Sequence, residues 1–391
     1  MTYFYETEER ILMRNIARDF VEQELLPIVQ QVDTDPESVD MKALYHRAGD
    51  LGILGLAVPE EYGGTGADYT TVAMVNEEIG KALPVMGLNI SVHSILSGEL
   101  IMLLGSDELK KRYLPDLASG KTLFACCSTE PIGALNHTEW QVSATEEDDC
   151  YVINGSKMLI SQAGLADKFV VLAVTTRPVD PATRFGISAF VVDAHAEGVT
   201  IGHHEHKFAM HGSASTTVTF NNVRVPKEDL IGERDKGAAG MMISATNEFM
   251  TCGPMCLGMA EHCFDVTLEY ARQRIQRGKN LLDNYQVIAH KFSEMWVKIE
   301  MLRATCYNVF DQKDKGKFQL AQGRMLKVIG SKIAMEVAAE CMQVYGGLGC
   351  ISETGIDRYW RDAKMLHIAG EASEALMDNI ADFIKADKTD I

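Results

Sequence analysis

The sequence lacks several features that would identify a protein class at once. Its nine cysteines are an odd number, scattered from Cys126 to Cys350, and they match neither a disulfide framework nor a zinc-binding spacing. This usage is typical of reduced thiols in the cytosol. Basic residues are few, 37 against 55 acidic ones, and the formal net charge of -18 makes nucleic acid and anionic membranes poor partners.

Long apolar runs, targeting segments and common nucleotide loops are also missing. No apolar stretch reaches the length of a membrane-spanning helix, about 18 residues. Met1 to Arg10 contains three acidic residues before any apolar run, so neither a secretory signal nor a transit peptide is predicted. We therefore expect a cytoplasmic protein. There is no Walker loop and no Gly-x-Gly-x-x-Gly after a strand, so a nucleotide would have to bind through another fold.

The composition and the texture of the chain predict the fold class. The 391 residues are 46% hydrophobic and 24% charged, which is typical of a soluble globular protein with two or three packed segments. Apolar residues recur at helical spacing from 6 to 120, short β-branched runs follow to about Pro226, and helical spacing returns from Gly237. The sequence predicts a mainly α protein with a central β domain, divided as 1–120, 121–232 and 233–391.

Local signals add finer expectations. Pro59 to Gly66 predicts a loop, after which a helix begins near Tyr69, and Asn154 to Lys157 predicts the turn of a hairpin. The carboxyl-terminal helices are predicted to break or end at four glycine sites: Gly278, Gly316, Gly330 and Gly346 with Gly347.

A single carboxylate is the clearest candidate for catalysis. Glu248 is the one charged residue between Gly237 and Ala260, a stretch of otherwise apolar and small residues. Burial without a cation raises the pKa of a carboxyl group toward neutrality, as a general base at pH 7 requires. The alternative is a glutamate on the solvated face of its helix.

Three other patterns have two interpretations each. The turns Thr129 to Gly133 and Asn154 to Lys157 could hold a planar or phosphorylated ligand through backbone N–H groups, or be ordinary turns. His203 to His206 looks like a metal cluster, but strand alternation would split its side chains between two faces, so we expect a solvated loop and no metal. The basic run Arg272 to Lys279 suits either a pyrophosphate or the carboxyl terminus of a helix.

Taken together, six collinear motifs resemble the acyl-CoA dehydrogenase family of flavoproteins over nearly the whole chain. The motifs are Val58 to Gly64, Thr129-Glu130-Pro131, Asn154 to Lys157, Val223 to Pro226, Gln343 to Gly349 and Arg358 to Lys364. The resemblance implies a helical domain, a β-barrel-like domain and a four-helix bundle. It also implies FAD as cofactor, an acyl-CoA substrate, a homotetramer built as a dimer of dimers, and an electron-transfer flavoprotein as electron acceptor.

The resemblance also assigns residues to the cofactor. The flavin contacts that it implies lie in Cys126 to Leu135 and Leu159 to Ser161, while a neighbouring subunit would hold the pyrophosphate and adenosine end. The residues so assigned are Cys127, Ser128, Thr129, Leu135, Leu159, Ile160, Ser161, Arg274, Gln286, Gln343, Gly346, Gly347 and Ser373. Leu135 is also assigned to the substrate.

The sequence departs from the family at the usual catalytic slot. Position 370, which usually holds the glutamate that takes the α proton, is a glycine, and Glu371 follows it. Glu248 matches the position of the base in the isovaleryl-CoA dehydrogenase branch, and Phe249 replaces the arginine usual after it. The backbone N–H at 370 is retained to stabilise the substrate carbonyl oxygen. The resemblance therefore implies Glu248 as base, with Gly370, Glu371 and Phe249 at the substrate.

Further departures leave the reaction open at this point. Leu135 stands for a serine, Leu159 for a tryptophan, Ala372 for a threonine and Arg277 for a phenylalanine. The first hypothesis is α,β-dehydrogenation of an acyl-CoA. The alternatives are an enoyl-CoA reductase running the reverse reaction in an anaerobe, a non-redox lyase or desulfinase-like relative, and a flavin-free scaffold.

Overall fold

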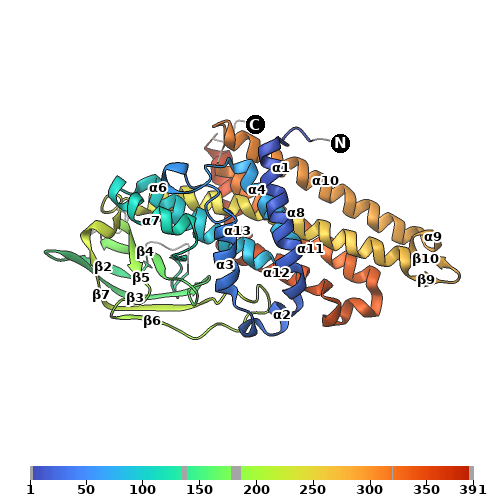
Figure 1. The fold of residues 1–391 in the computed structure, drawn as a ribbon, viewed down its shortest axis with the longest axis horizontal. Coiled ribbons are helices and arrows are strands. Elements are labelled where there is room, and N and C mark those ends of the chain that lie inside the picture. Colours follow the sequence, from blue (N-terminus) through green and yellow to red (C-terminus); the bar gives the residue numbers. More distant parts are fainter. Residues whose placement is uncertain (1–2, 134–138, 178–185, 319, 387–391) are drawn as a thin grey trace.

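The computed structural model describes residues 3–133, 139–177, 186–318 and 320–386. Helices come first, a β domain follows, and helices return to the end of the chain, which confirms the predicted fold class (Figure 1). The β domain occupies one end of an elongated molecule, and the long helices α8, α10 and α11 extend to the other end (Figure 1). Residue 120 lies between α7 and β1, and residue 232 between β8 and α8, while the division into domains there stays a prediction.

The first segment is built from short helices with well-defined starts. Side chains of Thr7, Asp40, Asp68 and Ser106 accept hydrogen bonds from backbone N–H groups in the first turns of α1, α3, α4 and α7, which satisfies donors that a helix leaves free. The helices of this segment are α1 (Glu8–Phe20), α2 (Val29–Thr34), α3 (Met41–Asp50), α4 (Tyr69–Ala82), α5 (Pro84–Ile90), α6 (Leu100–Leu104) and α7 (Asp107–Ala118), with wider turns at η1 (Val21–Leu25) and η5 (Ser91–Glu99).

One helical run corrects an expectation. Pro84–Leu104, formed by α5, η5 and α6, is long and apolar enough to cross a membrane by length and composition alone. However, 78% of its most apolar window is buried inside the protein, as in a core helix. Polar residues interrupt the run in the sequence, and two of them, Ser94 and His93, hydrogen bond to backbone groups in the interior.

The central segment folds into a mixed, mostly antiparallel sheet. Its strand order is β6-β7-β3-β2-β4-β5-β8, and β1 pairs with β4 in parallel. The strands are β1 (Phe124–Cys127), β2 (Ser143–Glu146), β3 (Cys150–Ile160), β4 (Lys168–Thr176), β5 (Gly186–Asp193), β6 (Val199–Ile201), β7 (Thr216–Pro226) and β8 (Leu230–Ile231). β1 also packs against η5 of the first segment, and residues at its end line the cavity described below.

The predicted hairpin turn at Asn154 to Lys157 is wrong. These residues lie in the middle of β3, which runs unbroken from Cys150 to Ile160. The pairing of β3 with β7 shifts register at Gly155, whose φ of 128° only glycine adopts readily. The Asn-Gly signal therefore marks a β-bulge, and a Cβ atom at Gly155 would lie 2.9 Å from Val142.

The last segment is a bundle of long helices. These are α8 (Gly237–Gln273), α9 (Leu281–Asn284), α10 (Gln286–Asp314), α11 (Leu320–Tyr345), α12 (Ile356–Ile368) and α13 (Ser373–Lys385), with a small hairpin of β9 (Ile275–Gln276) and β10 (Lys279–Asn280). Gly278, Gly316 and Gly346 lie at breaks with positive φ, as predicted. Gly330 does not break a helix, because it lies inside α11 where that helix approaches Gly253 of α8.

Helix α8 is held tightly against α4. At Gly258 of α8 an added Cβ would lie 1.9 Å from the carbonyl oxygen of Glu77, and at Gly80 of α4 it would lie 2.3 Å from that of Met255. The absence of both side chains lets the two backbones touch. This contact fixes the position of α8, and with it Glu248 three turns earlier in the helix.

Candidate active site

A cavity of about 820 Å³ opens between the β domain and the helices. One wall is formed by the ends of β1 and β3, and the others by η5, α8, α11 and the segment that joins α12 to α13. Of the sequence-predicted residues it brings together nine: Ser128, Thr129, Leu159, Ile160, Ser161, Glu248, Phe249, Gly370 and Glu371. Segments that are far apart in the sequence therefore meet at one site.

Glu248 is a buried carboxylate at this cavity. It is 5% exposed, lines the cavity, and its carboxylate makes no hydrogen bond to any residue in the described ranges. Burial raises its pKa to about 7, although the nearby Lys327 ammonium opposes the shift. The solvated-helix interpretation of Glu248 is therefore wrong. A carboxyl group that titrates near neutral pH can accept a proton from a bound molecule.

Gly370 and Phe249 make position 370 unfavourable for a glutamate. Gly370 has a φ of 75°, which disfavours any residue with a Cβ atom. An added Cβ would also lie 3.0 Å from Cε1 of Phe249. Phe249 thus occupies the space in front of position 370, while the preceding residue of the same helix supplies a carboxylate.

Two cations on the cavity wall were not singled out from the sequence. Arg324 and Lys327 both line the cavity from α11, and they are 5% and 1% exposed. Lys327 donates a hydrogen bond to the backbone carbonyl of Glu371, which holds the segment that carries Gly370. Their spacing of three residues puts them on one helix face. Together with the neighbouring Gly323 and Gly330, this spacing is the sequence signal that could have identified them.

The β-domain wall offers free hydroxyl groups and one exposed apolar side chain. Ser128, Thr129 and Ser161 line the cavity, and their hydroxyls make no hydrogen bond to a described residue. Leu159 is 54% exposed at the same wall. Such a mixture of apolar surface and unused hydroxyls fits a planar ring system with polar edges, as a flavin has. Cys127 is fully buried behind this wall and does not line it, and Leu135 lies outside the described residues.

An internal ion pair fixes this wall to the sheet. Nζ of Lys157 lies 2.9 Å from Oε1 of Glu130 and 2.9 Å from the carbonyl oxygen of Ser128. Both charged side chains are almost fully buried, and Nζ lies 3.8 Å from the centroid of the Trp140 ring. The Thr129 and Asn154 motifs thus meet in space, and their contact holds the segment that borders the cavity.

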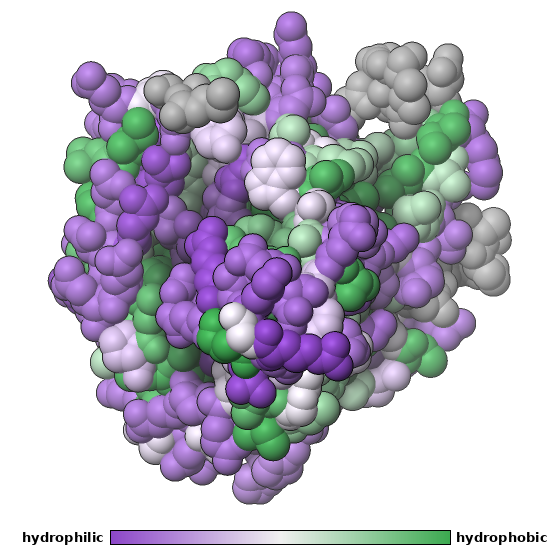
Figure 2. All heavy atoms as spheres, turned by 90° about the vertical axis from the view of Figure 1, so that its right-hand side faces the viewer, coloured by the Kyte–Doolittle hydropathy of each residue, from purple (hydrophilic) through white to green (hydrophobic). Residues whose placement is uncertain are grey.

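The remaining predicted residues lie away from the cavity. Gln286 begins α10 and Gln343 lies in the last turn of α11, while Gly346 and Gly347 follow α11 and Arg274 follows α8. This tip of the bundle faces the viewer in Figure 2, where hydrophobic patches interrupt a mostly hydrophilic surface. Ser373 is buried at the start of α13 and donates to the carbonyl of His367.

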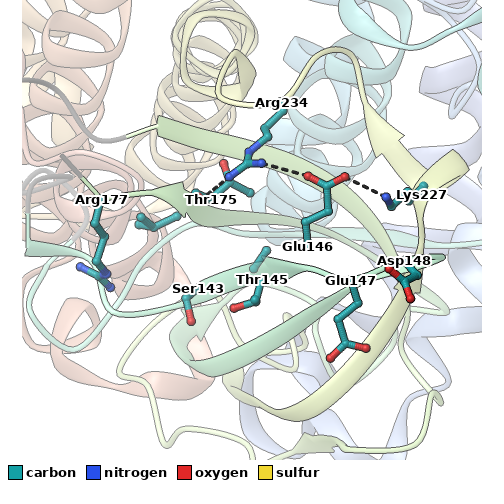
Figure 3. Close-up of a pocket in the computed structure, with 11 residues that line it drawn as sticks. Ser143, Thr145, Glu146, Glu147, Asp148, Thr175, Arg177, Lys227 and Arg234 are labelled. Atoms are coloured by element: carbon teal, nitrogen blue, oxygen red, sulfur yellow. Dashed lines mark hydrogen bonds and ion pairs between the residues drawn. The ribbon is translucent and has the colours of Figure 1, made fainter. Parts of the chain in front are cut away.

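A second hollow, of about 710 Å³, lies on the β domain (Figure 3). Glu146 lies between Lys227 and Arg234, with N–O distances of 2.8 and 2.9 Å, while the side chain of Glu147 points away from Glu146 (Figure 3). These charges neutralise one another at an exposed surface, where ion pairs contribute little.

Metal ligands do not gather anywhere in the described part of the chain. No group of three or more His, Cys, Asp or Glu residues there has the arrangement of a metal site. His203 to His206 form an exposed extended segment without regular structure.

Comparison with known families gives three matches in collinear order. The model described as "Acyl-CoA dehydrogenase, N-terminal domain" matches residues 7–121, the middle-domain model matches 125–223, and the C-terminal-domain model matches 235–385.

Individual proteins match over nearly their full lengths. An acyl-CoA dehydrogenase of Bacillus subtilis is 32% identical, and the match covers 93% of this chain and 94% of the relative. The caffeyl-CoA reductase-Etf complex subunit CarC of Acetobacterium woodii is 31% identical, with 93% and 95% covered. The solved structure of butyryl-CoA dehydrogenase from Megasphaera elsdenii superposes with a TM-score of 0.93 at 30% identity, covering 98% of this chain and all of that one.

Proposed function

This chain belongs to the acyl-CoA dehydrogenase family, and we propose that it catalyses the α,β-dehydrogenation of an acyl-CoA thioester with Glu248 as the base. As a member of this family it is an oxidoreductase that takes FAD as cofactor. The observation that carries the proposal is the unpaired carboxylate of Glu248, buried in the cavity and titrating near pH 7.

Glu248 and Gly370 have separate tasks in this proposal. The carboxylate of Glu248 removes the α proton of the thioester and holds it. The backbone N–H of Gly370 donates to the thioester carbonyl oxygen, which makes the α proton more acidic. Phe249 occupies the space in front of position 370, where the family's usual glutamate would begin.

The β-domain wall would hold the flavin. When bound, FAD supplies the hydride acceptor for the hydrogen that leaves the β carbon. The hydroxyls of Ser128, Thr129 and Ser161 would donate to its polar edges, and Leu159 would pack on its apolar face. The pair of Lys157 with Glu130 fixes this wall in place before the cofactor binds. Leu135 is proposed at the same contact.

A second candidate is the reverse reaction, the reduction of an enoyl-CoA. The match to a caffeyl-CoA reductase-Etf complex subunit supports it. In that direction the protonated form of Glu248 would deliver the proton to the α carbon. The same relative supports an electron-transfer flavoprotein as redox partner in either direction, and the nine unpaired thiols support a reducing compartment such as the cytoplasm.

The assembly is proposed to be a homotetramer. Helix α10 exposes Trp296, Val297 and Met301 at 55%, 48% and 63%, a large apolar set for a free surface. A neighbouring subunit packed there would also bring its Arg274, Gln286 and Gln343 toward a bound cofactor. Light scattering of the purified protein tests the tetramer.

The experiment that tests the reaction is anaerobic flavin absorbance. Purified flavoprotein is mixed with a panel of acyl-CoAs, including isovaleryl-CoA and butyryl-CoA, and the long-wavelength band is followed. We expect bleaching by at least one thioester, with a rate that rises with pH up to about 7 because the base must be unprotonated.

Two variants make the test specific for the base. Glu248→Gln should abolish bleaching, while Glu371→Gln, which removes the other carboxylate of the cavity, should retain it. Bleaching by the Glu248 variant but not by the Glu371 variant would refute the assignment. If a yellow wild-type protein is bleached by no acyl-CoA, reoxidation of the reduced enzyme by enoyl-CoAs separates the reductase from a non-redox relative.

A further inference from the structure

A buried guanidinium group without an ionic partner lines the cavity. Arg324 is 5% exposed, and its one hydrogen bond is a 3.3 Å contact from an Nη1 donor to the carbonyl of Leu320. Its Nε donor is buried without any partner, and it forms no ion pair with a residue of the described ranges. A guanidinium group removed from water in this way costs free energy unless an anion binds to it.

A second cation stands one turn along the same helix. Lys327 is 1% exposed, donates to the carbonyl of Glu371, and likewise has no ion pair among the described residues. Elsewhere in the protein a buried lysine has its counter-ion, because Lys157 pairs with Glu130 at 2.9 Å. The two cations of α11 therefore line the cavity without an ion pair to a described residue, while Glu248 and Glu371 lie near enough to interact with Lys327 electrostatically.

The acidic groups nearby do not occupy this wall. Glu371 lies close enough to interact with Arg324 electrostatically, but its Oε1 atom accepts a hydrogen bond from Nδ2 of Asn379, 2.7 Å away. Asp378 also lines the cavity, and its side chain is exposed to solvent. Cζ of Arg324 lies 5.4 Å from the centroid of the Phe383 ring. This contact orients the guanidinium group without neutralising its charge.

We propose that Arg324 binds a carboxylate carried by the acyl group, so that the substrate is the CoA thioester of a dicarboxylic acid. The inference rests on the proposed function and names its substrate class. The planar fork of the guanidinium suits a carboxylate, and Lys327 adds charge beside it. The phosphates of CoA are separated from the thioester by the pantetheine arm, whereas Arg324 lies one helical turn from the lysine next to Glu248.

The test is calorimetric binding to the flavin-loaded enzyme. Glutaryl-CoA is compared with valeryl-CoA, and succinyl-CoA with butyryl-CoA, so that each pair differs only in the terminal group. We expect the wild type to bind the dicarboxylic member of at least one pair about tenfold to a hundredfold more tightly. Arg324→Met should remove this preference and leave the affinity for the monocarboxylic thioester within about threefold.

Two further variants complete the design. Arg324→Lys keeps the charge but loses the fork and should retain part of the preference, while Lys121→Met removes one exposed charge elsewhere and should change nothing. Equal binding of both members of each pair by the wild type, or an equal loss for both in Arg324→Met, would overturn the proposal. Binding is measured separately from bleaching of the flavin. If valeryl-CoA bleaches the flavin but the enzyme binds both members of each pair equally, the carboxylate site at Arg324 is refuted and the proposed function is not. Failure of every thioester to bind refutes the proposed function itself.

Discussion

Replacing Glu248 by glutamine should make the protein more stable at high pH, in addition to removing the proposed base. The folded state raises the pKa of this carboxyl group from 4.5 to about 7. A raised carboxyl pKa means that the unfolded chain releases its proton first. The wild type therefore loses stability as pH rises from 4.5 to about 7, while the glutamine variant, which has no charge to bury, does not.

The size of the effect follows from the shift. The change from 4.5 to about 7 corresponds to about 3 kcal/mol of free energy of unfolding. The full difference between variant and wild type is present above pH 7 and has largely vanished at pH 5. Solvent screens this charge little, because the side chain is only 5% exposed.

The assay is urea unfolding of the flavin-loaded wild type and of Glu248→Gln between pH 5 and 8. Glu228→Gln, which changes an exposed carboxylate, is the matched control and should show no such trend. A Glu248→Gln variant with the same relative stability at every pH, or one less stable than wild type at pH 8, would refute the idea that the native protein buries a charge there.

Other predictions follow from the same contacts. Gly370→Ala should lower the free energy of unfolding by about 1–2 kcal/mol, because of the positive φ at this position and the contact with Phe249; chemical denaturation tests this. It should also lower kcat/KM for the acyl-CoA by displacing the backbone N–H, which steady-state kinetics tests. Lys157→Met should destabilise the protein by about 3–5 kcal/mol and weaken flavin retention, since it leaves the Glu130 carboxylate buried and unpaired; full retention of flavin and stability would contradict this. A thiol reagent should titrate one of the nine cysteines in the native protein, Cys350, and rapid reaction of more would show that the other eight are not buried.

The sequence predicted the architecture because periodicity differs between helices and strands. The change from helical spacing to short β-branched runs at about residue 123 coincides with the start of β1, and the return of helical spacing at Gly237 coincides with the start of α8. The errors have local causes. The Asn154-Gly155 pair is as suitable for a bulge as for a turn, and only pairing with β7 decides between them. Gly330 serves a helix contact that the sequence around it does not reveal.

A site residue could be predicted where it is the one charged residue in an apolar stretch, but not where it lies among other charged residues of a helix. Glu248 was visible because nothing else nearby is charged. Arg324 and Lys327 look like ordinary solvated helix residues, since α11 also carries Lys332 and Glu336. Their burial depends on α12, α13 and α8 packing around that face, which no local pattern records.

The arrangement of Glu248, Phe249 and Gly370 limits how this lineage can change by single steps. Moving the carboxylate back to position 370 requires a residue with a Cβ atom where φ is 75°, and it also requires Phe249 to leave the space in front of it. The backbone at position 370 and the ring of Phe249 would have to change together, so a substitution at position 370 alone cannot place a carboxylate there without strain.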